Sequence, residues 1–439
     1  MVTVKFVSGL KEIGGTFVEV ETLRSKCMFD FGYAHADLLD DRITLRKTKA
    51  ASDLASMGVL PVTDGIYDAR NAEALHVLPY GEPSVGKECF LLISHLHIDH
   101  IGGLGRLHPD IPVYMTKDSA RLYARLAAQG DVQGAAHKNV IGVDPFEPFT
   151  VGDITVTAMN VDHDIPGACG FLIRAQGKTI CYTGDFRFHG FHKEWSREFA
   201  HRAASADVDM LICEGTTVSH EDVNLKLLTT PEEGKRTEED LQIELAEKAR
   251  AARGLLLANF YNRNVERVHR MIATFQNAKR TLVLQEASAD YVAAFYPGDE
   301  ICVYADTLRH KDVPKSWRRV GAKEILTNPS AFCLELPYEH LYEAASFQNM
   351  TDAYLHLDGS PLGDYDPAYA TMLKVLDAFK IKYVHMGVSG HAEPYYLRLM
   401  IDTIAPRILV PLHSFRPEQV DSLMAGKRIL PEPGEVVTL

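Results

Sequence analysis

Residues 89–103, CFLLISHLHIDHIGG, decide how this chain folds. The first half, from Cys89 to Ile93, is a short apolar run bounded by polar residues, which predicts a buried strand. The second half holds four candidate metal ligands, which are His95, His97, Asp99 and His100. Imidazole and carboxylate groups suit zinc, and alternating ligands on one short loop can serve two neighbouring ions. The stretch therefore predicts a two-metal site at the end of a strand.

A polar loop whose histidines only cap a helix at Gly102 and Gly103 is the alternative interpretation of this stretch. One H-x-H pair would not decide between the two, because short motifs match by chance. Four clustered ligands directly after a buried strand favour the metal site.

Further candidate ligands follow other predicted strands. His163, Asp185 and Glu214 each lie just past the carboxyl end of an apolar run. In layered α/β folds, binding sites are built at that edge of the sheet. Asp30 in FDFG also ends a strand, where it is either a turn former or, as we expect, a residue that orients a ligand histidine.

Length and composition restrict the class of protein. A chain of 439 residues predicts two or three domains, and 46% hydrophobic with 24% charged residues is ordinary for a soluble protein. The seven scattered cysteines indicate a reducing compartment, and no apolar stretch is long enough to cross a membrane, so we expect a cytoplasmic protein. The net charge of −13 disfavours a polyanionic partner, so local charge has to decide that question.

The pattern along the chain predicts an insertion. Period-two alternation from Val2 to Gly32 predicts a hairpin of strands, and near residue 218 the composition shifts to charged sequence with Thr and Pro. Helix and strand signals then alternate up to about Glu286, which indicates a second α/β unit with a small parallel sheet, and the sequence is less regular from there to about Leu362. We expect a first domain part at 1–217, an inserted domain at 218–367 and a closing part at 368–439.

The motifs in this order resemble those of the metallo-β-lactamase superfamily. HLHIDH, VDHDIPGACGFLI with His163, and YTGDF with Asp185 carry that resemblance. Glu214 in CEGT, His391 in VSGHA and His413 in VPLHS resemble motifs A, B and C of the β-CASP nucleases, and the last part of the chain is similar to ribonuclease J. The resemblance implies an α/β fold, a metallo-β-lactamase αββα sandwich with an inserted β-CASP α/β domain.

The resemblance also implies a role for each candidate residue. Two Zn²⁺ ions, or Mn²⁺ in their place, would be held by His95, His97 and His163 on one side and by Asp99, His100 and His413 on the other. Asp185 would bridge the ions. Asp99, Glu214 and His391 are expected to be catalytic, with Glu214 orienting His391, which would stabilise the phosphate or protonate the leaving oxygen.

Substrate contacts are predicted at two places. Ser389 and Gly390 precede His391, where backbone N–H groups could bind a phosphate, although a tight turn before a helix fits equally well. Basic and aromatic residues also alternate in two later stretches, Gly254 to Arg280 and Arg309 to Lys323, which favours a single-stranded RNA contact over solvated helix faces. The predicted contacts are Arg263, Arg267, Arg318 and Arg319.

A zinc-dependent ribonuclease, acting as an endonuclease, a 5′–3′ exonuclease or both, is the leading interpretation. The alternatives are a DNA nuclease of the same branch, a non-catalytic RNA-processing subunit that binds RNA, and a hydrolase of small esters or lactams. His413 favours RNA, because RNA-acting members of the branch tend to have histidine there. The chain ends shortly after motif C, so we expect the extra C-terminal domain of ribonuclease J to be absent, and a homo-oligomer stays open.

Overall fold

The computed structural model describes residues 1–35, 38–39, 43–83, 86–220, 222–310 and 313–439. They form two compact units, of which the first joins Met1–Gly234 to Gly390–Leu439 and the second is Lys235–Ser389. The second unit is therefore an insertion in the sequence of the first. Its boundaries lie C-terminal to the expected 218–367, because residues up to Ser389 supply a helix and an edge strand to its own sheet.

Two mixed sheets form the centre of the first unit. One has the order β21 (Val436–Thr438), β1 (Thr3–Ser8), β2 (Phe17–Glu21), β3 (Ser25–Phe29), β4 (Glu88–Leu92), β5 (Val113–Thr116), β6 (Val140–Val143). The other has the order β20 (Lys427–Arg428), β19 (Ile408–Leu412), β11 (Met210–Glu214), β10 (Lys178–Tyr182), β9 (Cys169–Ala175), β8 (Ile154–Asn160), β7 (Phe149–Val151). The expected hairpin near the N-terminus is present, since β1, β2 and β3 pair antiparallel.

One hydrophobic core lies between these sheets. Phe6, Phe29 and Phe90 from the first sheet pack with Phe171 and Ile212 from the second, and all five side chains are buried. The inward-facing side chains alternate along each strand, as expected when one face of a sheet meets another sheet. The sheets are thereby fixed face to face, and their strand ends meet at common edges.

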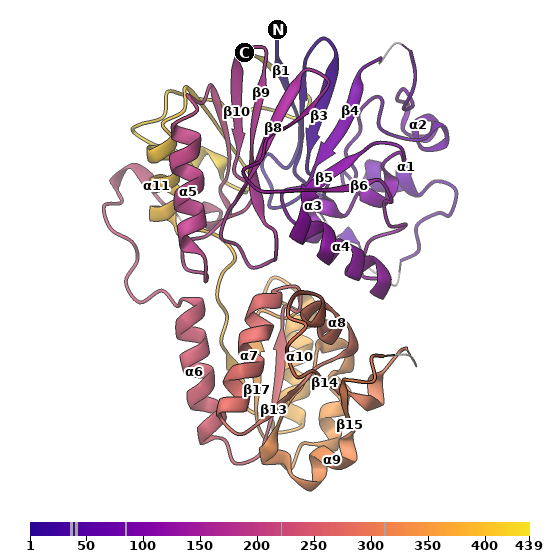
Figure 1. The fold of residues 1–439 in the computed structure, drawn as a ribbon, viewed down its shortest axis with the longest axis vertical. Coiled ribbons are helices and arrows are strands. Elements are labelled where there is room, and N and C mark those ends of the chain that lie inside the picture. Colours follow the sequence, from indigo (N-terminus) through magenta and orange to yellow (C-terminus); the bar gives the residue numbers. More distant parts are fainter. Residues whose placement is uncertain (36–37, 40–42, 84–85, 221, 311–312) are drawn as a thin grey trace. The chain divides into compact units, whose positions relative to one another are not determined.

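Helices cover the outer faces of the two sheets (Figure 1). On the side of the first sheet lie α1 (Ala50–Ser56), α2 (Ala69–Leu75), α3 (Ile98–Ile101) and α4 (Lys117–Gln129). On the side of the second lie α5 (Lys193–Ala204) and α11 (Pro394–Ile404), which contact each other. Helix α4 is typical, because the hydroxyl of Thr116 caps its first turn and Gly130, with φ 78°, ends it. The expected αββα layering is confirmed.

The second unit is built on a parallel sheet. Its strands have the order β13 (Thr281–Val283), β16 (Phe332–Glu335), β12 (Leu255–Phe260), β17 (Thr351–Leu357), β18 (Tyr383–His385). Its α-helices are α6 (Glu238–Ala251), α7 (Val265–Asn277), α8 (Glu286–Phe295), α9 (Ala322–Thr327) and α10 (Pro367–Ala378). A separate parallel pair joins β14 (Cys302–Tyr304) to β15 (Arg318–Val320). Strands β16 and β17 fall where the sequence indicated only irregular structure.

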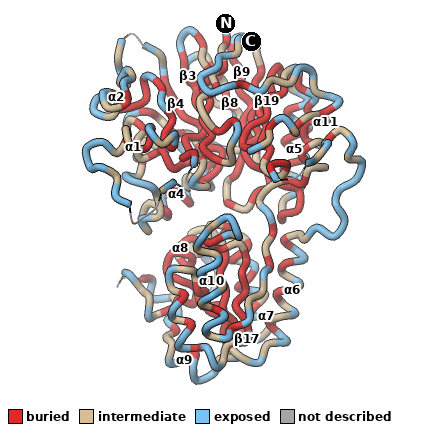
Figure 2. The backbone as a smooth tube through the Cα atoms, turned by 180° about the vertical axis from the view of Figure 1, so that it is seen from behind, coloured by how far each residue is buried: buried red, intermediate tan, exposed pale blue. Residues whose placement is uncertain are grey.

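Burial in the second unit follows the parallel sheet (Figure 2). Every residue of β12 is buried, as are those of β16, while the outer turns of α9 and α10 are exposed. Strands covered on both faces lack the alternation of a half-buried strand. That is why FCLE at 332–335 gave no clear strand signal.

Two features of the described residues bear on the setting of the protein. No helix among them is both long and apolar enough to cross a membrane. All seven cysteines are buried and none of them forms a disulfide.

Candidate metal centre

The candidate ligands gather at the carboxyl ends of strands that the sandwich brings together. His95 and His97 follow β4, and His163 follows β8. Strands β10, β11 and β19 are parallel neighbours, so the residues after them, Asp185 and His413, lie at the same edge as Glu214. The backbone of His413 is in the left-handed region, with φ 54°, and its N–H donates to the carbonyl of Gly9 at 2.8 Å.

Two groups of three candidate ligands lie at this edge of the sheets. The potential ligand atoms of His95, His97 and His163 lie within 4.8 Å of one another. Those of Asp99, His100 and His413 form a second group of the same size. The family resemblance implied one ion for each of these two groups.

Asp185 lies between the two groups. Its Oδ2 is 3.7 Å from Nε2 of His95 in the first group. The same oxygen is 3.3 Å from Nε2 of His100 and 3.7 Å from Nε2 of His413 in the second. This is the position of a carboxylate shared by both groups.

The atoms at the centre lack hydrogen bonds. Nε2 of His95 and Oδ1 of Asp185 are buried and make no hydrogen bond to any described residue. Burying polar atoms without partners is costly, so they indicate a bound group that supplies the interaction. Neutral imidazoles and carboxylates are the ligands that zinc and similar divalent cations take. The residues therefore fit two divalent cations.

Burial shifts the pKa of His163, and neighbouring groups shift the pKa of Asp185. Burial lowers the pKa of His163 to about 4, so its imidazole is neutral near pH 7. Burial alone would raise the pKa of Asp185, but the charges of His413 and His100 outweigh burial and hold it well below its usual range. A neutral imidazole and an ionised carboxylate can both donate electron pairs to a cation.

Partners outside the site orient several of the histidines. Nδ1 of His100 donates to Oδ2 of Asp30 at 2.8 Å, and the hydroxyl of Tyr182 donates to the same oxygen at 2.6 Å. Nδ1 of His163 donates to the carbonyl of Gly390 at 2.6 Å. Asp30 thus lies where the sequence expected a residue that orients a ligand.

His391 and Glu214 form a pair beside the candidate ligands. Nδ1 of His391 is 3.2 Å from Oε2 of Glu214, and Oε1 of Glu214 accepts from the backbone N–H of Phe186 at 3.4 Å. Burial would lower the pKa of His391, but the carboxylate of Glu214 outweighs it and raises that pKa to about 9. His391 is therefore an imidazolium near pH 7, able to donate a proton or to stabilise an anion.

Sequence reasoning missed two residues of the site. Asp164 lies 3.2 Å from Nε2 of His97 and 3.4 Å from Nε2 of His163. Its position directly after His163 was the only feature of the sequence that could have identified Asp164 as a residue of the site. The hydroxyl of Thr216 lies 2.9 Å from Nδ1 of His413, and its place at the end of CEGT was the only sign of it in the sequence.

Ser389 and Gly390 belong to different units. Gly390 contributes its carbonyl to His163, so its observed role is to support a histidine. Ser389 is exposed at the end of the second unit. A phosphate contact through their N–H groups stays a prediction.

The prediction of an RNA contact at Arg267 is wrong. Its side chain is 0% exposed, and its guanidinium pairs with Glu238 at 2.8 Å and with Asp358 at 2.9 Å. The sequence shows that residue 267 is basic and lies among other basic residues. The packing of α7 decides whether its side chain faces solvent or the core. Arg263 is half-buried, whereas Arg318 and Arg319 are exposed on β15.

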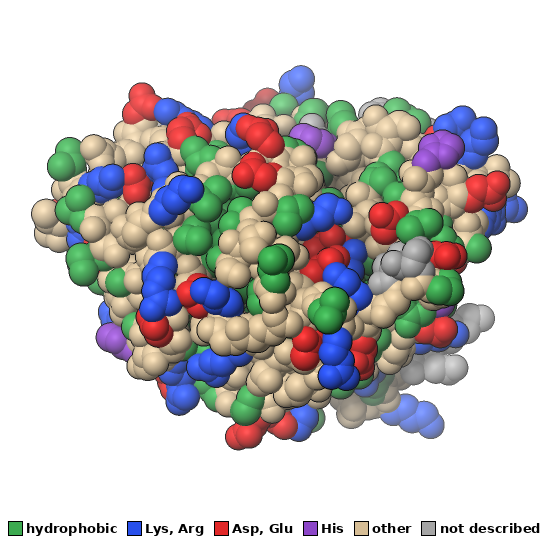
Figure 3. Space-filling model, turned by 90° about the horizontal axis from the view of Figure 1, so that it is seen from above, with side chains coloured by type: hydrophobic (Ala, Val, Ile, Leu, Met, Phe, Trp, Pro, Cys, Tyr) green, Lys and Arg blue, Asp and Glu red, His purple; other side chains and the backbone are tan. Residues whose placement is uncertain are grey.

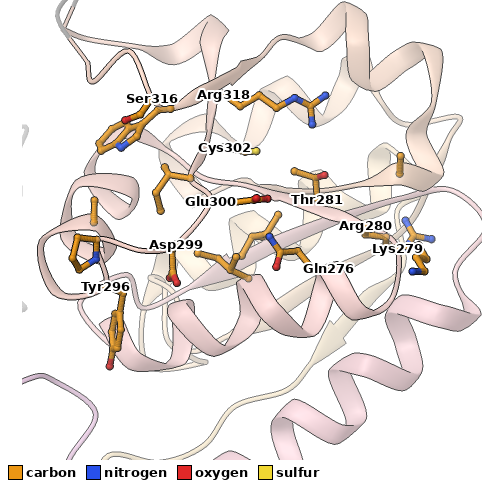
Figure 4. Close-up of a pocket in the computed structure, with 17 residues that line it drawn as sticks. Gln276, Lys279, Arg280, Thr281, Tyr296, Asp299, Glu300, Cys302, Ser316 and Arg318 are labelled. Carbon is orange, nitrogen blue, oxygen red and sulfur yellow. The ribbon is translucent and has the colours of Figure 1, made fainter.

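The two basic stretches of the second unit meet around one cavity (Figure 4). It has a volume of about 700 Å³, and Lys279 from the first stretch lines it together with Trp317 and Arg318 from the second. The guanidinium of Arg318 pairs with Glu324, and Asp299 and Glu300 also line the cavity. The cavity thus combines cations and an aromatic ring with carboxylates.

Comparison with known proteins places these observations in a family context. Residues 61–256 match the family model of the β-lactamase superfamily domain. Ribonuclease J of Mycoplasma genitalium is 25% identical over 349 residues, which cover 74% of this chain and 57% of that protein. Ribonuclease J of Helicobacter pylori J99 is 22% identical over 429 residues, which cover 93% of this chain and 55% of that protein. The chain thus spans little more than half the length of these curated relatives.

A solved structure is similar over its whole length. The crystal structure of a protein of unknown function from Enterococcus faecalis V583 has a TM-score of 0.83 and 28% sequence identity, and the match covers 100% of both chains. Both units of this chain therefore have a counterpart in a solved protein.

Proposed function

We propose that this chain, which belongs to the metallo-β-lactamase superfamily and to its ribonuclease J-like β-CASP branch, is a metal-dependent ribonuclease. It would hydrolyse phosphodiester bonds of single-stranded RNA as an endonuclease, a 5′–3′ exonuclease or both. The observation that carries the proposal is the position of Asp185 between two groups of three ligands, with the His391–Glu214 pair beside them.

The chemistry follows from what each side chain can do. Two Zn²⁺ ions, or Mn²⁺ in their place, would lower the pKa of a water and polarise the phosphodiester. His95, His97 and His163 would hold one ion, Asp99, His100 and His413 the other, and Asp185 both. Asp99 would in this way take part in catalysis as a ligand.

His391 would act on the substrate directly. Because its pKa is raised to about 9, the imidazolium carries a proton at neutral pH. It would stabilise charge on the phosphoryl oxygens or protonate the leaving oxygen, while Glu214 keeps it oriented and charged. A basic leaving oxygen needs such a donor near neutral pH.

Local charge supports an RNA substrate despite the net charge of −13. On the face shown in Figure 3, basic and acidic side chains are interspersed, so the acidic excess does not form one continuous area there. In the second unit, Lys279, Trp317 and Arg318 line the same cavity, and Arg319 is exposed on β15. Cations for phosphates and a ring for a base are what single strands require.

Cleavage assays with His413→Ala test the proposal. The metal-loaded wild type should cleave single-stranded RNA carrying a 5′-monophosphate or a 5′-triphosphate, and comparison of the two ends distinguishes end-dependent from internal cleavage. His413→Ala should lose more than the roughly 10- to 100-fold that substitutions outside the ligand shell cost. The matched control is His201→Ala, an exposed histidine on α5.

The same assay separates the alternatives. Cleavage of a DNA strand of equal sequence in preference to RNA would indicate a DNA nuclease. Binding of RNA without any cleavage by metal-loaded protein would indicate a non-catalytic subunit. Full activity in His413→Ala would contradict its role as a ligand.

A further inference from the structure

One carboxylate at the metal centre has no role in the motifs described above. Asp164 follows His163, and its side chain is 14% exposed. Its Oδ1 is buried, and Nε2 of His97 lies 3.2 Å from it. A buried carboxylate oxygen needs a partner that the structure brings within reach.

The other candidate histidine ligands share an arrangement. Each has a polar partner on Nδ1, while Nε2 points toward the centre. The partners are the hydroxyl of Ser94 for His95 at 3.0 Å, Asp30 for His100 at 2.8 Å, the carbonyl of Gly390 for His163 at 2.6 Å, and the hydroxyl of Thr216 for His413 at 2.9 Å. Such partners fix the tautomer and the ring orientation of a metal ligand.

His97 fits the same scheme with its two nitrogens exchanged. Its Nδ1 lies 3.4 Å from Nε2 of His163, so Nδ1 is the nitrogen that faces the other ligand atoms. Its Nε2 is then the nitrogen that carries the proton, and the nearest carboxylate oxygen to it is Oδ1 of Asp164. Asp164 therefore stands where the partner of His97 is required.

The surroundings leave room for this carboxylate and hold it in place. A Cβ atom on residue 390 would lie 3.2 Å from both Cγ and Oδ1 of Asp164 and 3.0 Å from Cε1 of His163. Glycine at 390 avoids that crowding. The buried guanidinium of Arg187 donates to the carbonyl of His163 at 3.2 Å and lies 3.4 Å from Oδ1 of Asp162, which fixes the backbone on which Asp164 sits.

We propose that Asp164 is a positioning residue for His97: its carboxylate accepts a hydrogen bond from the N–H of Nε2, so that Nδ1 is left to bind the first metal ion. This inference rests on the metal binding in the proposed function and does not depend on RNA being the substrate. A direct bond from Asp164 to the ion is the competing arrangement, because Oδ1 also lies 3.4 Å from Nε2 of His163.

Titration of the metal-free protein with Co²⁺ tests the proposal. Asp164→Ala should weaken Co²⁺ binding at one of the two sites by roughly 10- to 100-fold. At saturation its absorption bands should match those of the wild type, because the ligands themselves are unchanged and the bands report geometry and ligand type. Asp164→Asn should keep most of the affinity, since its amide oxygen still accepts a hydrogen bond. The control is Asp118→Ala, an exposed aspartate on α4.

Three results would overturn the proposal. Unchanged Co²⁺ affinity in Asp164→Ala would show that His97 needs no such partner. Altered absorption bands at saturation would show that Asp164 is itself a ligand. Equal losses in Asp164→Asn and Asp164→Ala would exclude the hydrogen bond. Wild-type protein that binds Co²⁺ but cleaves no RNA would instead contradict the ribonuclease proposal alone.

Discussion

The metal centre of the first unit and the Arg267 cluster of the second both bury several charged groups. In the Arg267 cluster the guanidinium donates to Glu238, to Asp358 and to the carbonyls of Leu357 and Val388. In the metal centre, by contrast, buried atoms of His95 and Asp185 make no hydrogen bond to a described residue. A cluster whose charges satisfy each other stabilises a fold, whereas converging ligand atoms without partners indicate a bound cation.

The largest effect should follow from removing the shared carboxylate of the metal centre. Asp185→Asn removes a negative charge from between the two ligand groups, so bound metal should fall and kcat/KM for RNA should drop on the order of 10³-fold or more. Metal content by mass spectrometry and cleavage rates measure the two effects. The control is Asp118→Asn, at an exposed position on α4. Wild-type activity in Asp185→Asn would contradict the interpretation that this cluster binds metal.

The Arg267 cluster should respond in stability. Arg267→Ala leaves Glu238 buried without its cation, so the free energy of unfolding should fall by about 3 to 5 kcal/mol. Hydrogen exchange of the second unit, together with denaturant unfolding, measures the loss. Arg270→Ala breaks a surface pair with Glu266 on the same helix and should cost about 0.5 kcal/mol. Similar small losses in both variants would mean that the cluster is not structural.

Glu335 is a third buried ionisable group. Its carboxyl accepts hydrogen bonds from the hydroxyl of Ser288 and the backbone N–H of Gln285. Burial raises the pKa of Glu335 from the usual 4.5 of a glutamate to about 7. The unfolded chain ionises this carboxyl near pH 4.5 while the folded chain does not, so the free energy of unfolding decreases as pH rises from there to about 7. A pKa shift of that size corresponds to a decrease of roughly 3 kcal/mol in the free energy of unfolding.

Glu335→Gln should remove this pH dependence. Its denaturation midpoint should stay flatter between pH 4.5 and 7 than that of the wild type, as followed by denaturant unfolding at each pH. Glu247→Gln, at an exposed position on α6, is the control and should leave the slope unchanged. A wild-type slope in Glu335→Gln would contradict the raised pKa.

The smallest effect is expected at the exposed cations of the second unit. Arg318→Ala combined with Arg319→Ala should weaken binding of single-stranded RNA several-fold and reduce the dependence of log affinity on log salt by about 1 to 2. Arg250→Ala with Arg253→Ala removes the same charge from exposed positions away from β15. If affinity and salt slope stay at wild-type values, RNA does not contact β15.

The sequence, through the resemblance of its motifs to a known superfamily, was sufficient to predict the layered architecture and to propose the set of candidate ligands. Strand signals such as CFLLI are local, and each candidate ligand follows one of them or lies in a short motif with a recognisable spacing. Parallel strands place their carboxyl ends at one edge, so residues distant in sequence could be expected to meet there. The structure brings His95, His163, Asp185 and His413 together at that edge.

Strands β16 and β17 and the end of the second unit were harder to predict. Both strands are covered on both faces, so they lack the alternation that identifies a half-buried strand. The C-terminal boundary of the second unit, at Ser389, depends on the pairing of β18 with β17. That pairing is a contact between two segments and not a property of either one.

By itself, the sequence determined which side chains have metal-binding chemistry and on which strand ends they stand, because residue type and local spacing decide both. Only the tertiary structure decided that Arg267 is a core residue, that Gly390 supports His163 through its carbonyl, and that Asp164 faces His97. Those outcomes depend on which face of an element packs inward and on which distant segment lies against it. No local pattern in one sequence contains that information.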